Sequence, residues 1–510
     1  MADQNTFIRT MQEGYTVAGG SIILGAPLLD GGCPAGPVVK VPLRTMNRHG
    51  LIAGATGTGK TKTLQLLAEQ LSLQGVPSLL MDVKGDLSGI AVPGAANDKI
   101  TTRYEKLGLS WEPARIPVEL LTLSNEPGAR LRATISEFGP VLLGRILELN
   151  DTQQSVLALV FKYCDDNGMP LLDLKDIRRV LQFVTQEGKA DIQKQYGAVS
   201  PATVNIILRK LIEIEQQGAD RFFGERSFDP QDLLGPRDGK GVVHIVRLTD
   251  IQDRPRLFST FMLCLLAEIY GTFPEVGDPE KPKLVLFIDE AHLIFDTATK
   301  ALLDQIETMI KLIRSKGVGV YFCTQDPSDV PDSVLGQLGL KVQHALRAFT
   351  AKDRTTIKKT AQNYPETAFY NVEALLTSLG IGEALVTALS EKGTPMPLAH
   401  TLLRTPGTRM DVLTPDEIQG VVRASAIAAK YNEVIDRESA FEILEKRMKD
   451  HSGDDPGPGP APAPKPGKGK VEPSMIETIS KNPLVKQMMN TGMREVTRGI
   501  FGWLGLKKRR

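Results

Sequence analysis

Cysteine is scarce in this sequence, and long apolar runs are absent. The four cysteines are scattered, with no CxxC pair and no histidine at ligand spacing, which argues against a disulfide framework or a zinc site and fits a reducing cytosol. The first residues, MADQNTFIRTMQEGYTV, lack the apolar core of a signal peptide. The longest apolar stretch, residues 257–267, is too short to span a bilayer and ends at Glu268. We therefore expect a soluble, cytoplasmic protein without a transmembrane segment.

The sequence also lacks an excess of either charge. Lys and Arg total 61 against 60 for Asp and Glu, which gives a formal net charge of +1. Such a balance neither indicates nor excludes a nucleic-acid partner, because a ring-shaped assembly can enclose a basic channel within a neutral whole. Hydrophobic residues make up 41% and charged residues 24% of the chain, ordinary values for a globular protein. A length of 510 residues allows about three domains, or one α/β core with insertions.

The hydrophobic pattern changes along the chain and predicts an α/β core interrupted by helices. Strands are predicted at residues 49–53, 78–83, 242–246, 284–288, 318–324, 342–349, 382–389 and 398–403. Because most of these strands alternate with helical segments, we expect a mostly parallel sheet covered by helices on both faces. The predicted division is a short β-rich N-terminal segment with at most a reduced barrel (1–48), an α/β core (49–111 and 242–405), an all-α insertion (112–241), C-terminal helices (406–451), a Pro/Gly-rich linker (452–473) and an amphipathic, basic-ended helix (474–510).

A glycine-rich loop follows the first strand of this core. Residues 54–61, GATGTGKT, fit the pattern GxxxxGK[ST], and residues 60–74 have helical spacing. Glycines let such a loop turn its N–H groups toward phosphate oxygens, and the helix N-terminus adds its positive dipole end. Lys60 is expected to reach the β- and γ-phosphates of ATP, and the Thr61 hydroxyl to bind Mg²⁺. The predicted nucleotide-binding residues are Gly54, Ala55, Thr56, Gly57, Thr58, Gly59, Lys60, Thr61 and Lys62.

Two carboxylates follow the apolar strand at residues 284–288. Ligands bind at the carboxyl ends of parallel strands, so Asp289 and Glu290 are expected at the same edge of the sheet as the glycine-rich loop. Asp289 is expected to hold Mg²⁺ through its water shell, and Glu290 to polarise the attacking water as a general base. Together the two motifs predict a P-loop NTPase of the RecA-like (ASCE) type that hydrolyses ATP with magnesium.

Polar residues also follow two other predicted strands. The segment MDVKGD, residues 81–86, either tunes the position of the metal or water, or forms a polar turn. Gln325 follows the strand at 318–324 and is a candidate for hydrogen bonding to the γ-phosphate or the attacking water. Both segments are expected at the edge of the sheet that binds the nucleotide.

The order of the segments GATGTGKT, MDVKGD, LFIDEAH, IRSKGVGVYFCTQDPSDVP and ALRAFTAKD resembles the HerA–FtsK group of P-loop motors over about residues 20–405. Within that group the chain is most similar to HerA-type helicases and the bacterial YjgR proteins. The resemblance implies a homo-hexameric ring with ATP sites between subunits, and double-stranded DNA as the substrate. It also implies an arginine supplied in trans to the γ-phosphate, with Arg314 favoured over Arg347 on the predicted strand 342–349. From the 48 residues that precede the P-loop strand, we expect at most a reduced form of the β-barrel of HerA-type helicases.

The expected function is therefore ATP hydrolysis by a ring ATPase that translocates or unwinds DNA. The alternative is a switch or assembly ATPase that acts on protein partners without nucleic acid, through the all-α insertion and the C-terminal helix at 474–510. That helix either packs on the ATPase core or a neighbouring subunit, touches an anionic membrane or nucleic acid through its basic end, or binds a groove on a partner.

Overall fold

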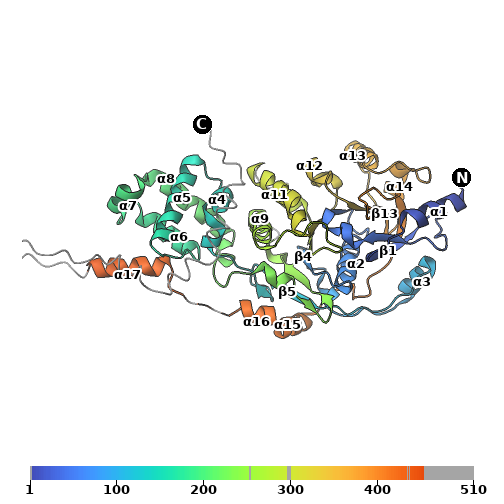
Figure 1. Cartoon of the computed structure of the whole chain (residues 1–510), viewed down its shortest axis with the longest axis horizontal. Coiled ribbons are helices and arrows are strands. Elements are labelled where there is room, and N and C mark those ends of the chain that lie inside the picture. The colour runs from blue at the N-terminus through green and yellow to red at the C-terminus, as the bar shows by residue number, and fades with distance from the viewer. Residues whose placement is uncertain (1–2, 252–253, 296–299, 434, 436, 453–510) are drawn as a thin grey trace, which may run out of the picture.

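One sheet forms the centre of the molecule, and helices cover both of its faces (Figure 1). The computed structural model describes residues 3–251, 254–295, 300–433, 435 and 437–452. The strand order is β2-β1-β14-β13-β12-β3-β11-β10-β4-β9-β5-β6. The predicted α/β fold class is therefore confirmed. The predicted C-terminal helix at 474–510, and the predicted linker beyond Ser452, lie outside the described residues.

The middle of the sheet is parallel. Its strands are β3 (Gly50–Ala53), β11 (Val318–Thr324), β10 (Leu284–Ile288), β4 (Ser78–Asp82), β9 (Val243–Arg247), β5 (Val118–Thr122) and the short β6 (Ala129–Arg130). In β10, Leu284, Leu286 and Ile288 join the core on one face of the sheet, whereas Val285 and Phe287 join the core on the other. A strand that is buried on both faces is apolar at every position, which explains the continuous apolar run in the sequence.

Helices pack on the two faces of this sheet. α2 (Lys60–Leu73) buries Leu64, Leu67 and Leu71 against one face, and α9 (Pro255–Thr272) and α11 (Lys300–Ile313) pack against the other. The α2 helix therefore begins at the glycine-rich loop and is anchored along its length by the sheet. The remaining helices of the core are α3 (Asp98–Leu107), α10 (His292–Phe295), α12 (Asp332–Leu335), α13 (Ala351–Gln362) and α14 (Val372–Ser378).

The N-terminal segment extends the main sheet. β1 (Ser21–Pro27) pairs with β2 (Val39–Pro42) and with β14 (Ala399–Leu403), and all of these pairings are antiparallel. The sheet then continues through β13 (Glu383–Thr387) to β12 (Leu340–Gln343), which runs parallel to β3. The segment also contains a helix that was not predicted, α1 (Gln4–Gly14), which buries Phe7 and Met11. Its two apolar contacts are too few for a clear helical pattern in the sequence.

The all-α insertion is shorter than the predicted range 112–241. β5 and β6 fall inside that range but belong to the parallel sheet, and β7 (Pro236–Arg237) and β8 (Lys240–Gly241) form a small hairpin. The helices are α4 (Ile135–Ile146), α5 (Asp151–Asp166), α6 (Leu174–Phe183), α7 (Lys189–Tyr196) and α8 (Pro201–Gln216). The predicted boundary was wrong because a short apolar run such as VELLT cannot be told from a buried helix segment by periodicity.

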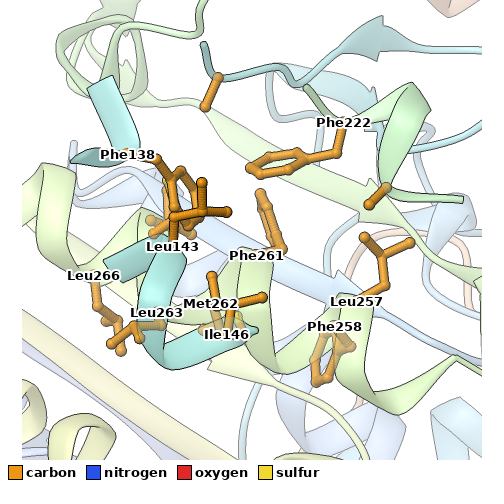
Figure 2. Close-up of a cluster of buried hydrophobic side chains, with 14 of the residues drawn as sticks. Phe138, Leu143, Ile146, Phe222, Leu257, Phe258, Phe261, Met262, Leu263 and Leu266 are labelled. Carbon is orange, nitrogen blue, oxygen red and sulfur yellow. The ribbon is translucent and has the colours of Figure 1, made fainter. Parts of the chain in front are cut away.

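A shared apolar cluster joins the helical insertion to the α/β core. Figure 2 shows Phe138 and Leu143 of α4 on one side of this cluster and Phe261 of α9 on the other, with Phe222 next to Phe261. The rings of Phe222 and Phe261 meet edge to face, with centroids 5.9 Å apart. Aromatic pairs of this kind have a preferred ring geometry, so they fix the relative orientation of the packed side chains in addition to burying apolar area. The insertion therefore shares one hydrophobic core with α9.

The C-terminal helices run from the core to the insertion (Figure 1). The segment before them is held by Glu69 of α2, whose carboxylate accepts the N–H groups of Gly407 and Thr408 over 3.0 Å and 2.7 Å. At the far end, Arg179 of α6 donates to Glu445 over 3.0 Å. The chain after β14 thus connects the helix of the glycine-rich loop to the helical insertion. Its helices are α15 (Pro415–Ala424), α16 (Ala426–Tyr431) and α17 (Ala440–Ser452).

Candidate functional site

The glycine-rich loop lies between β3 and α2, at the carboxyl ends of the parallel strands. Gly54, Gly57 and Gly59 have φ angles of 149°, 79° and 113°, which side-chain-bearing residues rarely adopt. A Cβ on Gly54 would also lie 2.5 Å from the Cβ of His344. The backbone of the loop therefore requires the glycines that predicted it from the sequence.

Lys60 lies buried within the loop. Its Nζ donates to the carbonyl of Gly54 over 2.6 Å and to that of Ala55 over 3.2 Å, and burial lowers the pKa of Lys60. The ammonium therefore lies within the glycine-rich loop, bonded to two of its carbonyls. Lys62 differs, because its side chain leaves the loop and donates to the carbonyl of Met410. Only the backbone N–H of Lys62 remains a candidate for phosphate binding.

Asp289 is buried at the end of β10 and fits a cation site. Burial raises the pKa of Asp289 to about 6. Its Oδ2 atom has no hydrogen-bond partner in the described part of the chain. Thr61, the second predicted Mg²⁺ ligand, is in the first turn of α2 and partly exposed. Across the described ranges, no cluster of three or more His, Cys, Asp or Glu side chains is placed to hold a metal ion. Mg²⁺ often binds with one or two protein ligands, water and substrate phosphates, so this sparse donor set suits it.

Glu290 is held by two cationic or protonatable side chains. Its Oε1 atom forms an ion pair with Nζ of Lys84, and its Oε2 atom lies 3.1 Å from Nδ1 of His292. The side chain is buried, and the residue has a φ angle of 48°, in the left-handed region. Residues other than glycine rarely adopt this conformation, and it is concentrated at functional sites. The carboxylate thus lies at the edge of the sheet between Lys84 and His292.

The MDVKGD segment forms a polar turn, one of the two alternatives that the sequence left open, and also brings one side chain to Glu290. Asp82 accepts the backbone N–H groups of Gly85 and Asp86 over 2.8 Å and 3.2 Å, and therefore builds the turn. Burial raises the pKa of Asp82 to about 7. Lys84 instead reaches out of the turn to Glu290, and this contact raises the pKa of Lys84 although burial opposes it. Lys84 was predicted only as one polar residue of this segment and not as a site residue, although its position after a strand was a usable signal.

Gln325 is brought to the glycine-rich loop. β11 lies between β3 and β10, and the hydroxyl of Thr56 donates to Oε1 of Gln325 over 3.3 Å. The neighbouring Thr324 donates to Asp329, which fixes the start of the turn after the strand. Gln325 therefore lies between the loop and the Asp289–Glu290 pair, as its place after β11 predicted.

Both candidate arginines, Arg314 and Arg347, are exposed. In the described part of the chain, neither of them contacts the glycine-rich loop. Arg314 precedes β11, whose 7 residues span roughly 20 Å, so it lies toward the edge of the sheet opposite the loop. Arg347 lies in the loop after β12 and not on a strand as predicted, because β12 ends at Gln343. The chain leaves the sheet after β12. Just beyond that point, the carbonyl of Ala345 accepts the N–H of Ala55 in the glycine-rich loop over 2.8 Å.

Two further residues support the loop and were missed. Nε2 of His344 lies 2.9 Å from the hydroxyl of Thr63, and burial, with a contribution from Lys60, lowers the pKa of His344 to about 4. On another side, the N–H of Gly382 donates to the carbonyl of Thr58 over 3.1 Å. No motif marks either position in the sequence, because both residues follow the loop by hundreds of positions, His344 directly after β12 and Gly382 directly before β13.

None of the helices in the described part of the chain combines the length and apolarity needed to cross a membrane. Comparison with solved structures finds the same fold in a bacterial conjugative coupling protein, TrwBdeltaN70. Its unbound monoclinic form is 15% identical, with 80% of this chain and 95% of that chain covered and a TM-score of 0.50. Its trigonal form in complex with sulphate is also 15% identical, with 79% and 94% covered and a TM-score of 0.50.

Sequence comparison finds the DNA double-strand break repair helicase HerA of Sulfolobus acidocaldarius, 21% identical over 355 residues. The alignment covers 68% of this chain, and the chain spans 64% of the length of that relative. A family model described as helicase HerA-like C-terminal matches residues 33–509. Because this match takes in nearly the whole sequence, the chain belongs to the helicase HerA-like C-terminal family.

Proposed function

We propose that the protein hydrolyses ATP with magnesium as a HerA-type ring ATPase and uses the energy to translocate or unwind DNA. The observation that carries the proposal is the placement of the glycine-rich loop, Gln325 and the Asp289–Glu290 pair at neighbouring ends of β3, β11 and β10. Membership of the HerA-like family and the relative named as a DNA-repair helicase support DNA as the substrate.

Phosphate binding is assigned to the loop from Gly54 to Lys62. Its backbone N–H groups and the N-terminus of α2 would receive the phosphates, and Lys60 would move from the carbonyls of Gly54 and Ala55 to the β- and γ-phosphates. The hydroxyl of Thr61 and the carboxylate of Asp289 would hold Mg²⁺. Magnesium, when bound, neutralises the charge that develops on the phosphate oxygens.

Water activation is assigned to Glu290. A general base must reach the water that it polarises, and the contact with Lys84 would hold the carboxylate at the edge of the sheet where that water binds. Gln325 would orient the same water or the γ-phosphate from the adjacent strand. The ion pair with Lys84 is therefore assigned to positioning the proposed base.

The ring is proposed as a homo-hexamer in which each ATP site is completed by an arginine of the neighbouring subunit. Arg314 remains the favoured residue, because it is exposed on an edge of the core distant from its own loop and is free to face another subunit. Arg347 is the second candidate. An arginine supplied in trans is worth about 10³–10⁵ in rate in related systems.

The test is ATP turnover by purified protein, alone and with double-stranded DNA, single-stranded DNA or RNA, with Glu290→Gln as the blank. Stimulation by DNA that falls as salt rises supports a DNA motor. Lys60→Ala should abolish turnover, and unchanged turnover in that variant contradicts the assignment of the site. Turnover that requires Glu290 but ignores every nucleic acid would retain the ATPase and favour a switch that acts on protein partners.

A further inference from the structure

The segment from Arg347 to Gln362 concentrates positive charge in a chain that is otherwise balanced. It contains five basic residues and one acidic residue, whereas the whole chain has a net charge of +1. The segment consists of the loop after β12 and the helix α13, which lies at the surface beside α12 and α14 (Figure 1). The positive charges in such a cluster repel one another, and this repulsion must be offset by solvent or by an anionic partner.

The basic side chains share the outer side of α13. Ile357 and Thr360 are buried and anchor the opposite side of the helix. The exposed basic residues are Lys352, Arg354, Lys358 and Lys359. None of these four forms an ion pair with another residue in the ranges that the structure describes. They are therefore available to an external anion.

The one acidic residue of the segment is occupied by the backbone. Oδ2 of Asp353 accepts the N–H groups of Phe349 and Thr350, each over 2.8 Å, and the N–H of Asp353 donates to the hydroxyl of Thr350 over 3.2 Å. This capping box fixes the loop at the start of α13. It leaves the ring of Phe349 86% exposed next to the basic helix. A fully presented aromatic ring beside unpaired cations matches the combination that binds single-stranded nucleic acid.

This surface is connected directly to the nucleotide loop. The N–H of His344 donates to the carbonyl of Ala53 over 2.7 Å, and the carbonyl of Ala345 accepts the N–H of Ala55 over 2.8 Å. Phe349 follows Ala345 by four positions in the chain. A change in the loop on binding or losing phosphate therefore acts on the residues that lead into α13. This connection suits a surface that must bind and release its partner as the nucleotide state changes.

We propose that the α13 basic surface, defined as Phe349, Lys352, Arg354, Lys358 and Lys359, binds a nucleic-acid strand. The cationic side chains contact successive phosphates, and the ring of Phe349 stacks on an unpaired base. The proposal rests on the proposed function for the identity of the substrate. It goes beyond that function because it names the surface and assigns a preference for unpaired bases to one residue.

The charge is tested by removing two lysines. The affinity of wild type and Lys358→Gln/Lys359→Gln for a labelled single-stranded oligonucleotide is measured over a series of salt concentrations, without ATP. We expect about tenfold weaker binding and a salt slope reduced by about 1.4, since each phosphate contact contributes about 0.7 on a single strand. The matched control is Lys189→Gln/Lys194→Gln on α7, two exposed lysines whose loss should change neither quantity. Equal affinity and slope for wild type and the α13 variant overturn the proposal.

The stacking is tested with Phe349→Ala on single-stranded and duplex DNA of the same sequence. We expect about tenfold weaker binding to the single strand and unchanged binding to the duplex, because a duplex offers no unpaired base. An equal loss on both forms, or a changed oligomeric mass with unchanged affinity, overturns the stacking role. If wild type binds DNA and these variants bind equally well, only this surface assignment fails. If wild type binds no nucleic acid, the DNA part of the proposed function fails as well.

Discussion

The carboxylate of Glu290 is paired with the ammonium of Lys84. The two residues are far apart in the sequence, but they follow β10 and β4, which are neighbours in the sheet. The contact places a cation beside the proposed general base and identifies a residue that no nucleotide-binding motif includes. It leads to the first of four predictions.

Lys84→Met should lower kcat with little effect on ATP affinity. Lys84 contacts Glu290 but none of the loop atoms that would bind phosphate, so its loss should displace the base without removing the nucleotide site. Misplacement of a catalytic group can cost about 10²-fold in rate. Steady-state turnover and binding of a fluorescent ATP analogue separate the two effects. Lys84→Arg keeps the charge and should retain more activity, and equal kcat in wild type and Lys84→Met would contradict a positioning role.

Glu290→Gln should bind ATP and hydrolyse it slowly. The amide keeps the size of the side chain but cannot accept a proton, and general-base catalysis is worth about 10²–10⁴ in rate. A single-turnover experiment should show bound ATP persisting on the variant. Turnover near the wild-type rate would mean that another group activates the water.

Arg314→Ala should lose hydrolysis, by about 10³-fold or more, and keep ATP affinity. Because the arginine is proposed to act in trans, mixing Arg314→Ala with Glu290→Gln subunits should restore some activity where an intact pair meets at an interface. The same measurements on Arg347→Ala decide between the candidates. Loss of hydrolysis in Arg347→Ala alone would assign the role to that residue.

Glu268→Gln should stabilise the protein at high pH. Burial, with smaller contributions from Glu137 and Asp229, raises the pKa of Glu268 from 4.5 to about 7. Between these pH values the folded state holds a proton that the unfolded state has released, so the free energy of unfolding falls as pH rises through that window. Above pH 7 the variant should gain on the order of 2 kcal/mol over wild type. Chemical denaturation from pH 4 to 8 measures this, with the exposed Glu275→Gln as the control. An equal gain at pH 4 and pH 8 would assign the effect to packing.

The sequence by itself determined the elements of the proposed nucleotide site. The spacing of Gly54, Gly57 and Gly59 is required by φ angles that only glycine adopts readily, and the apolar run of β10 is required by burial on both faces. Because these constraints are local or periodic, they can be recognised from the sequence alone. The same holds for Asp289, Glu290 and Gln325, because each directly follows a recognisable strand.

Only the tertiary structure decided which distant residues meet at this edge. The pairing of Lys84 with Glu290, the contact of His344 with Thr63 and the position of β5 in the sheet all depend on strand order. Strand order is set by how the whole chain buries its apolar faces, and no short segment encodes it. The exposure of Phe349 likewise depends on the turn that Asp353 caps and on where β12 ends. The sequence therefore predicted which residue types form the site, whereas packing between distant segments determined which other residues contact them.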